Sequence, residues 1–117
     1  MSSLPPSRGD VWDTRFEPTE GREQGGIRPA VILSHNSINR GPSEMVVVVP
    51  MTTRHRPQLE SIRTEVRPPE AGLSEVSYVI PDQLRAVSTS RLISRRGRVN
   101  DQTLAEVADR VRVVLDL

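Results

Sequence analysis

Short apolar runs separated by polar loops are the main pattern along this chain, and most of them have the alternation or the β-branched composition of strands. Such runs predict strands at residues 9–16, 27–34, 44–52, 62–67, 75–81, 84–88 and 95–99. The run at 44–52 contains four consecutive valines, and a continuous apolar strand is typically covered on both faces. Segment 62–67 alternates instead, which predicts a half-exposed strand whose polar face carries Arg63.

The C-terminal end has helical periodicity. Its apolar residues recur every three or four positions and form one stripe, made of Leu104, Val107, Ala108, Val111, Val114 and Leu115. Asn100 or Asp101 can cap the start of this helix. Residues 35–43 predict a turn or a single helical turn, and the glycine-rich segment 17–26 predicts a long loop of the kind that often carries function. Many short strands and one terminal helix predict a mainly β fold with some α: a small, curled antiparallel barrel followed by a helix.

Composition narrows this picture to one domain. The chain has 117 residues, which fits a single domain at 8–117 after a short disordered lead at 1–7. Hydrophobic residues make up 35% of the chain, and only Trp12, Phe16 and Tyr78 are aromatic. The core must therefore consist of Val, Ile, Leu and Ala. A core this thin favours completion by a partner subunit, so we expect a homodimer.

Charge and the missing residue types exclude several classes of protein. There is no cysteine, so disulfides and thiolate chemistry are excluded. No apolar run approaches the roughly 18 residues of a membrane span, and residues 1–7 lack the features of a signal peptide. We expect a cytoplasmic protein with no membrane partner. The net charge is only +1, but all sixteen basic residues are arginine, whose planar fork suits phosphate.

The familiar catalytic motifs are absent from the sequence. There is no phosphate-binding glycine loop and no G-x-S-x-G elbow, and His35 and His55 lack the spacing of metal ligands, so we expect no metal and no cofactor. What remains is Arg28, at the end of the long loop, and the pair Thr52 and Thr53, at the end of a buried strand. From spacing alone, an ordinary surface arginine and an ordinary strand threonine are the favoured interpretation, ahead of a functional pair.

Residues 8–34, RGDVWDTRFEPTEGREQGGIRPAVILS, resemble the opening of the MazF/PemK toxin family. The matching positions are Arg8, Gly9, Asp10, Val11, Trp12, Pro18, Gly21, Glu23, Arg28 and Pro29. VVVVPMTT is similar to the family's third strand, which ends in a catalytic threonine, and PDQLRAVSTSRL resembles a later family segment. The likeness runs from Arg8 to Leu117, and it is weakest between Thr53 and Ser74.

The resemblance implies a fold, an activity and a set of site residues. The fold is a small SH3-like antiparallel β-barrel with a C-terminal α-helix, as in MazF and CcdB, and it forms a homodimer. The implied protein is the toxin of a type II toxin–antitoxin system, an endoribonuclease that cuts single-stranded mRNA at specific sequences, inhibiting translation and growth. The site residues that it implies are the catalytic Arg28, Thr52 and Glu23 and the RNA-binding Gln24, Thr53, Gln83 and Arg85. Some relatives carry a histidine where this chain has Ile27, so a mechanism that uses that histidine is excluded here.

Metal-independent RNA cleavage uses the 2′-hydroxyl of the substrate as nucleophile and leaves 2′,3′-cyclic phosphate and 5′-hydroxyl ends. Arg28 suits the developing charge on the phosphorane, and Thr52 can donate its hydroxyl to the same phosphate. Glu23 is one candidate base. The further arginines Arg85, Arg91, Arg95, Arg96 and Arg98 fit phosphate contacts and a solvated strand face equally well.

The expected partners are single-stranded RNA and a MazE-like antitoxin, with DNA reached only through the antitoxin complex. Two alternatives have the same fold. One is a CcdB-like toxin that binds gyrase and has no nuclease activity, and the other is a non-catalytic member that only binds a partner.

Overall fold

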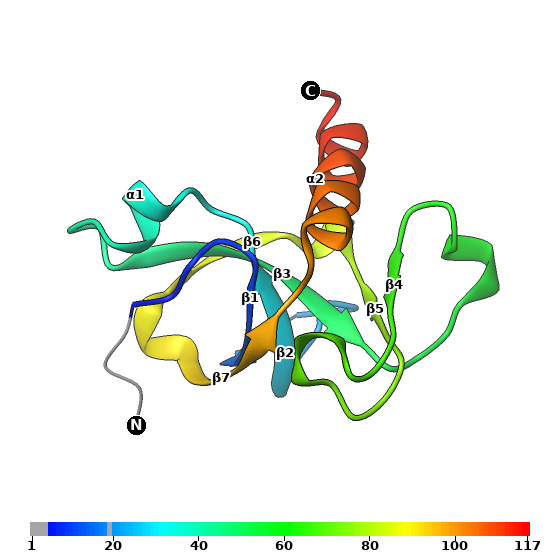
Figure 1. The fold of residues 1–117 in the computed structure, drawn as a ribbon, viewed down its shortest axis with the longest axis horizontal. Coiled ribbons are helices and arrows are strands. Elements are labelled where there is room, and N and C mark those ends of the chain that lie inside the picture. The colour runs from blue at the N-terminus through cyan, green and yellow to red at the C-terminus, as the bar shows by residue number, and fades with distance from the viewer. Residues whose placement is uncertain (1–4, 19) are drawn as a thin grey trace.

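The computed structural model describes residues 5–18 and 20–117 of the chain. Its strands form a seven-stranded antiparallel sheet of β1 (Asp10–Arg15), β2 (Ile27–Ile32), β3 (Met45–Thr52), β4 (Thr64–Val66), β5 (Ser77–Val79), β6 (Arg85–Ser88) and β7 (Leu92–Arg98). The helices are the single turn α1 (Asn36–Asn39) and the terminal α2 (Asp101–Leu115), as Figure 1 shows. Short 3-10 turns lie at η1 (Pro57–Leu59), η2 (Glu70–Gly72), η3 (Pro81–Gln83) and η4 (Thr89–Arg91). The prediction of a mainly β fold with a C-terminal helix is confirmed.

Strand β3 is the centre of the sheet. The strand order is β4-β5-β3-β2-β1-β7, and β6 also pairs with β3. One edge of β3 pairs with β2, while the other pairs first with β6 and then, at its C-terminal end, with β5. The sheet curls into a half-barrel, and η2 packs against β7. A Cβ at Gly97 would lie 2.7 Å from the carbonyl carbon of Ala71, so this close approach requires glycine.

Each face of the curled sheet carries its own core, because successive side chains of a strand point to opposite faces. The first core includes α2 and consists of Val11, Val31, Val49, Met51, Val66, Ala71, Leu73, Val79, Val99, Val107 and Val111. The second consists of Trp12, Phe16, Ala30, Ile32, Val46, Val48 and Val87. The valine run of β3 is thus covered on both faces, as predicted. The prediction that the core consists of Val, Ile, Leu and Ala was wrong, because Trp12 and Phe16 are buried in the second cluster.

Helix α2 begins where the sequence predicted and ends outside the core. The Asn100 side chain accepts a hydrogen bond of 2.7 Å from the Thr103 amide, which identifies Asn100 as the N-cap. Val107 and Val111 are buried, but Val114 and Leu115, on the same stripe, are exposed. The C-terminal half of the helix projects beyond the sheet (Figure 1). In the part of the chain that the structure describes, no helix is both long enough and apolar enough to cross a membrane.

Three segments differ from the expected boundaries. Strand β7 begins at Leu92 rather than at residue 95, because its pairing with β1 continues through two register shifts to reach Thr14. Strand β4 begins only at Thr64, and β5 is limited to Ser77–Val79. Residues 1–4 of the expected lead lie outside the described residues. The end of the lead is attached to β1, because the Ser7 amide donates a hydrogen bond of 2.9 Å to the Asp10 carboxylate.

Candidate active site

Pairing between β2 and β3 places Arg28 opposite Thr52. Ala30 pairs with Pro50 in this antiparallel register, and the same register continued by two residues brings Arg28 level with Thr52. Both side chains therefore lie on one face of the sheet, just beyond the end of the second core. The Thr52 side chain is largely buried, and its hydroxyl oxygen accepts a hydrogen bond of 3.2 Å from the Arg54 amide. Arg28 is exposed, and its Nε donates to the Gly25 carbonyl at 3.2 Å.

A cavity of about 290 Å³ opens between these two residues. Its lining contains four of the expected site residues: Gln24, Arg28, Thr52 and Thr53. The rest of the lining is entirely arginine: Arg54, Arg56 and Arg63. Within residues 5–18 and 20–117, no carboxylate lines this cavity. The small net charge of the chain therefore hides a local concentration of cationic groups of the kind that attracts phosphate.

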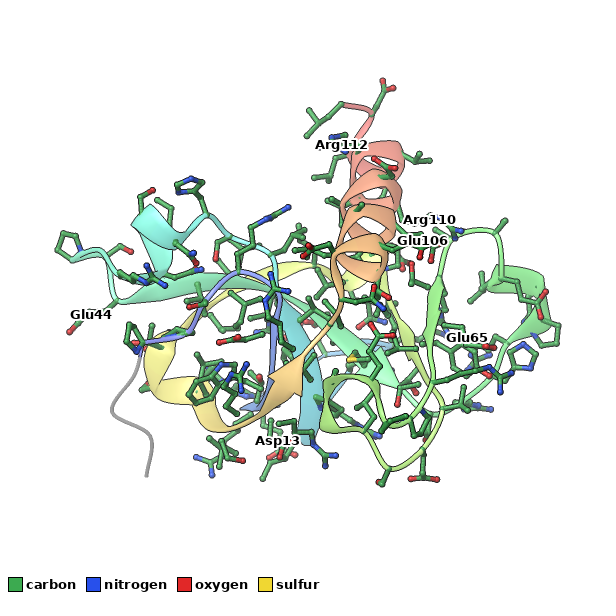
Figure 2. All side chains as sticks on the ribbon, in the orientation of Figure 1. Asp13, Glu44, Glu65, Glu106, Arg110 and Arg112 are labelled. Carbon is green, nitrogen blue, oxygen red and sulfur yellow. The ribbon has the colours of Figure 1, made fainter. Side chains whose placement is uncertain are left out.

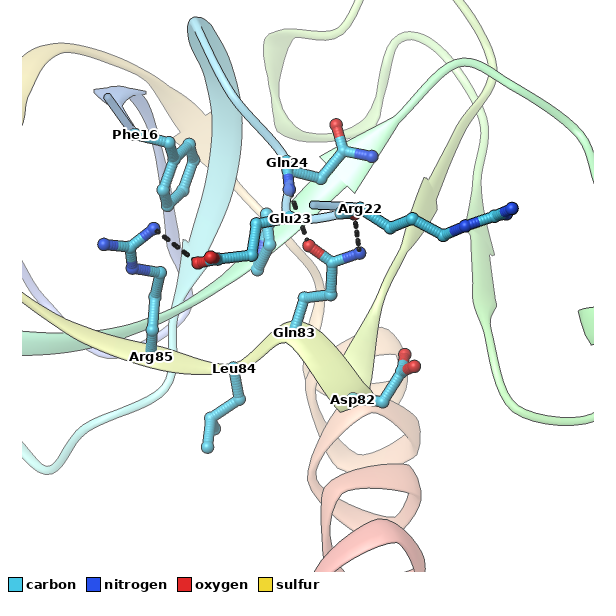
Figure 3. Close-up of a pocket in the computed structure, with 9 residues that line it drawn as sticks. Phe16, Arg22, Glu23, Gln24, Asp82, Gln83, Leu84 and Arg85 are labelled. Atoms are coloured by element: carbon cyan, nitrogen blue, oxygen red, sulfur yellow. Dashed lines mark hydrogen bonds and ion pairs between the residues drawn. The ribbon is translucent and has the colours of Figure 1, made fainter. Parts of the chain in front are cut away.

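The other expected residues line a neighbouring cavity of about 490 Å³ beside the 17–26 loop. Figure 3 shows Glu23, Gln24, Gln83 and Arg85 around it. The Arg85 guanidinium lies over the Phe16 ring, 5.6 Å from its centre, and 3.9 Å from the Glu23 carboxylate. Gln24 lines both cavities, so the two spaces adjoin. The structure thus brings all seven expected residues to one surface but separates Glu23 from Arg28 and Thr52.

Gln83 holds the loop that carries Glu23 and Gln24. Its Oε1 accepts a hydrogen bond of 2.7 Å from the Gln24 amide, and its Nε2 donates to the Arg22 carbonyl at 3.2 Å (Figure 3). The sequence assigned Gln83 to RNA contact. In the structure both ends of its side-chain amide are used to position the loop.

Four of the arginines considered as phosphate contacts are engaged elsewhere. On β7, Arg95 pairs with Asp10 at 3.2 Å and Arg96 pairs with Asp13 at 2.7 Å. Arg98 pairs with Asp101 at 3.3 Å, and Arg91 donates to the carbonyls of residues 15 and 17, at the start of the loop. These contacts favour the interpretation of a solvated strand face. Only Arg85 of that group lines either of the two cavities described above.

The arginines that follow Thr52 and line its cavity were not among the residues predicted from the sequence. Arg54 and Arg56 could have been suspected from their closeness to Thr52 in the chain, but Arg63 had no such signal, since its strand was predicted to be half-exposed. A side chain of α2 holds the segment that contains Arg63 in place. The Arg110 guanidinium donates to the carbonyls of Ser61 and Arg63, at 2.8 and 3.0 Å, and Figure 2 shows Arg110 on the helix side that faces this segment.

Both the sequence and the fold match those of known proteins. The profile of the "PemK-like, MazF-like toxin of type II toxin-antitoxin system" family matches residues 7–115. The chain belongs to this toxin family. An endoribonuclease MazF of Staphylococcus saprophyticus is 30% identical over 110 residues, covering 94% of this chain and 91% of that relative.

Solved structures of MazF proteins have the same fold as this toxin. MazF from Deinococcus radiodurans matches with a TM-score of 0.83 and 28% identity, over 98% of this chain and 100% of that one. A chain of the MazE–MazF structure from the same organism matches with a TM-score of 0.78 and 28% identity, over 98% and 99% of the two chains. The curled half-barrel with a C-terminal helix is therefore the MazF architecture.

The contacts of Gln83 lead to a prediction about loop dynamics. Replacing Gln83 with Ala removes the acceptor of the Gln24 amide, so that amide should exchange with solvent about fivefold faster, as expected for the loss of about 1 kcal/mol of hydrogen bonding. NMR hydrogen exchange measures this rate. Gln102→Ala is the matched control, because Gln102 is an exposed glutamine on α2 that lines none of the cavities described here. An unchanged rate for Gln24 in Gln83→Ala would show that the loop is held by other contacts.

Proposed function

We propose that this toxin is a sequence-specific, metal-independent endoribonuclease that cuts single-stranded RNA. The single observation that carries the proposal is the cavity between Arg28 and Thr52. A guanidinium group and a hydroxyl group line it together with three further arginines. A phosphodiester is the ligand that such a lining fits best. Neither the gyrase-binding nor the purely partner-binding alternative has need of this arrangement.

The proposed reaction begins with attack of the substrate's 2′-hydroxyl on the adjacent phosphorus. The 5′-oxygen leaves with the electron pair of the broken bond and takes up a proton, so the products are a 2′,3′-cyclic phosphate and a 5′-hydroxyl end. Arg28 stabilises the extra negative charge of the phosphorane by donating two hydrogen bonds to its oxygens. Thr52 donates its hydroxyl to the same group. No cofactor is required, because the nucleophile belongs to the RNA.

Glu23 is our candidate for the group that accepts the 2′-hydroxyl proton. Its carboxylate faces Arg85 and accepts a hydrogen bond of 2.9 Å from the Glu20 amide, in the cavity next to Arg28. Acting as the base therefore requires the loop to move when RNA binds. Catalytic hydrogen bonds often become aligned only once the substrate is in place.

Bases of the RNA would be read in the cavity beside the loop. The Gln24 side chain offers an amide group there, and the Arg85 guanidinium offers a stacking surface. Gln83, whose amide holds the loop, would present Gln24 to the RNA. Thr53, exposed at the mouth of the Arg28 cavity, is placed to contact the backbone. Single-stranded bases are recognised in this way, by their edges and faces in combination.

A homodimer and an antitoxin complete the proposed system. The end of α2 leaves Val113, Val114, Leu115 and Leu117 exposed, and an apolar cluster of this kind marks a surface that binds protein. The valine run of β3, by contrast, is covered within the subunit and needs no partner. The proposed antitoxin is MazE-like, since a MazF of Deinococcus radiodurans matched above is found with MazE. We place the toxin in the cytoplasm, in contact with DNA only through the antitoxin complex.

The cleavage mechanism predicts activity without divalent metal. The toxin should cut a single-stranded RNA in excess EDTA, because Arg28 and Thr52 supply the stabilisation that a metal would otherwise give. Replacing one ribose at the cut site with deoxyribose should abolish the cut, since the nucleophile is removed. Gel analysis of end-labelled RNA measures both, with Arg28→Ala prepared in parallel as the control for contaminating nuclease. Cleavage of an all-DNA strand, or strict dependence on magnesium, would contradict the mechanism.

The forked geometry of Arg28 predicts a specific order among three variants. Arg28→Ala should lower the single-turnover rate about 10²–10³-fold, the usual effect of losing one oxyanion-type donor. Arg28→Lys should be nearly as slow, because lysine keeps the charge and loses the planar fork. Thr52→Ala should lose about 10- to 100-fold, because a neutral donor is weaker than a charged one. Thermal melts run in parallel test folding, and a wild-type rate for Arg28→Ala would refute the site.

The exposed end of α2 predicts a dimer in solution. Light scattering at micromolar concentration should give twice the mass of the chain, because burying Val113, Val114 and Leu115 removes apolar surface from water. Leu115→Glu should shift the population toward monomer. Gln102→Glu, the same added charge on the other end of the helix, should leave the dimer intact. A stable monomer of the unaltered toxin would contradict this assignment.

A further inference from the structure

Arg63 has an unusual environment for an arginine. Two of its guanidinium nitrogens, Nε and Nη1, are shielded from solvent and have no hydrogen-bond partner among residues 5–18 and 20–117. Leaving a buried charged donor unpaired is unfavourable in a protein that serves no ligand. The contact with Arg110 does not account for the buried guanidinium, because Arg110 binds only the backbone carbonyl oxygen of Arg63. The side chain therefore has unused capacity to bind an anion.

Arg63 also lies where several cavities meet. It lines the Arg28 cavity, a second one of about 340 Å³ that leads toward Gln24 and Gln83, and a third of about 440 Å³ that leads toward Tyr78. Arg56 lines the same three spaces. A strand that places one phosphate between Arg28 and Thr52 must continue into one of the spaces on either side. Arg63 and Arg56 border both ways out.

Arg63 forms no ion pair among the described residues, although carboxylates line the two cavities beyond it: Asp82 in one, and Glu60, Glu65 and Glu106 in the other. Burial lowers the pKa of the Arg63 guanidinium, Asp82 nearby raises it and Arg56 lowers it again. Arginine stays protonated under such conditions, so the group remains a cation. Asp82 forms neither a hydrogen bond nor an ion pair with Arg63 among the residues described. A phosphate would satisfy the shielded donors and offset the repulsion between the two arginines.

We propose that Arg63, assisted by Arg56, binds the phosphate that adjoins the scissile phosphate of the RNA. This second phosphate site rests on the proposed function, and it deepens that function by assigning a register to the bound strand. Arg28 and Thr52 hold the phosphate that reacts. Arg63 holds its neighbour, which fixes the direction in which the backbone leaves the cavity and so helps to align the 2′-hydroxyl for attack.

The test uses an RNA made uncleavable by one 2′-deoxyribose at the mapped cut site, with single phosphates replaced in turn by neutral methylphosphonates. Wild-type toxin should lose affinity about 10-fold or more when one phosphate next to the scissile one is neutralised. Arg63→Gln should bind unmodified RNA with the same loss of affinity. It should lose no further affinity when the adjacent phosphate of the RNA is neutralised. Its affinity should also depend less on salt, with a log–log slope smaller in magnitude by about 0.7 for one phosphate contact on a single strand.

Arg67→Gln is the matched control, because Arg67 is an exposed arginine that pairs with Glu65 at 2.7 Å and lines none of these cavities. It should bind like wild type. Thermal melting separates binding from a structural role: Arg63→Gln should melt at the wild-type temperature or higher, because it removes an unpaired charge from a shielded position. A marked fall in melting temperature, with wild-type affinity at a temperature where Arg63→Gln is fully folded, would assign Arg63 to folding and overturn the proposal.

Other outcomes also decide the matter. Three results would each overturn the second phosphate site. The first is wild-type affinity in Arg63→Gln. The second is that the losses from Arg63→Gln and from neutralising the adjacent phosphate simply add, and the third is that Arg63→Gln couples to the scissile phosphate instead. Stabilisation by inorganic pyrophosphate, measured by melting without RNA, tests the anion site independently. If wild-type toxin binds no RNA, the proposed function fails, while a pyrophosphate shift that Arg63→Gln abolishes would still support an anion site. The same shift in both proteins would overturn that site as well.

Discussion

Antiparallel pairing between β2 and β3 is the constraint on which the site depends. Every backbone hydrogen bond between the two strands fixes the same register, and that register brings Arg28 level with Thr52 on one face of the sheet. A slip of one residue between the strands would place Arg28 and Thr52 on opposite faces of the sheet and would mix the side chains of the two cores. The burial of valines on both sides of β3 therefore stabilises the fold and holds the proposed catalytic pair in place.

Two long-range tethers extend this order to parts of the site that lie outside the sheet. Gln83 fixes the loop between β1 and β2 through the Gln24 amide and the Arg22 carbonyl. Arg110 fixes the segment before β4 through backbone carbonyls. Loops are usually the most variable parts of a small domain, and functional groups on them need support from a rigid element. Here η3 and α2, which pack against each other, give that support.

The concentration of arginine around Thr52 is unfavourable for the unliganded protein and favourable for binding an anion. Arg28, Arg54, Arg56 and Arg63 line one small cavity, and like charges at this spacing repel one another. Opposite charges elsewhere bring the net charge of the chain to +1. Stability given up at such a site is a common accompaniment of function. Binding of RNA would supply negative charge to this cavity, whose lining contains no carboxylate among the described residues.

The sequence by itself determined the strands, the terminal helix and its Asn100 cap, because alternation, valine runs and capping are local patterns. With the family resemblance it also predicted Arg28 and Thr52 as the catalytic pair that we propose, since each lies in a contiguous motif. Only the tertiary structure decided that Gln83 is occupied with the loop and that Glu23 lies beside Arg85. It also decided that two guanidinium nitrogens of Arg63 are shielded with no hydrogen-bond partner in the described part of the chain. Each of these depends on contacts between residues far apart in the chain, such as Gln24 with Gln83 or Ser61 with Arg110. Sequence periodicity reports which face a residue occupies, but the partner that meets it there is set by how the sheet curls.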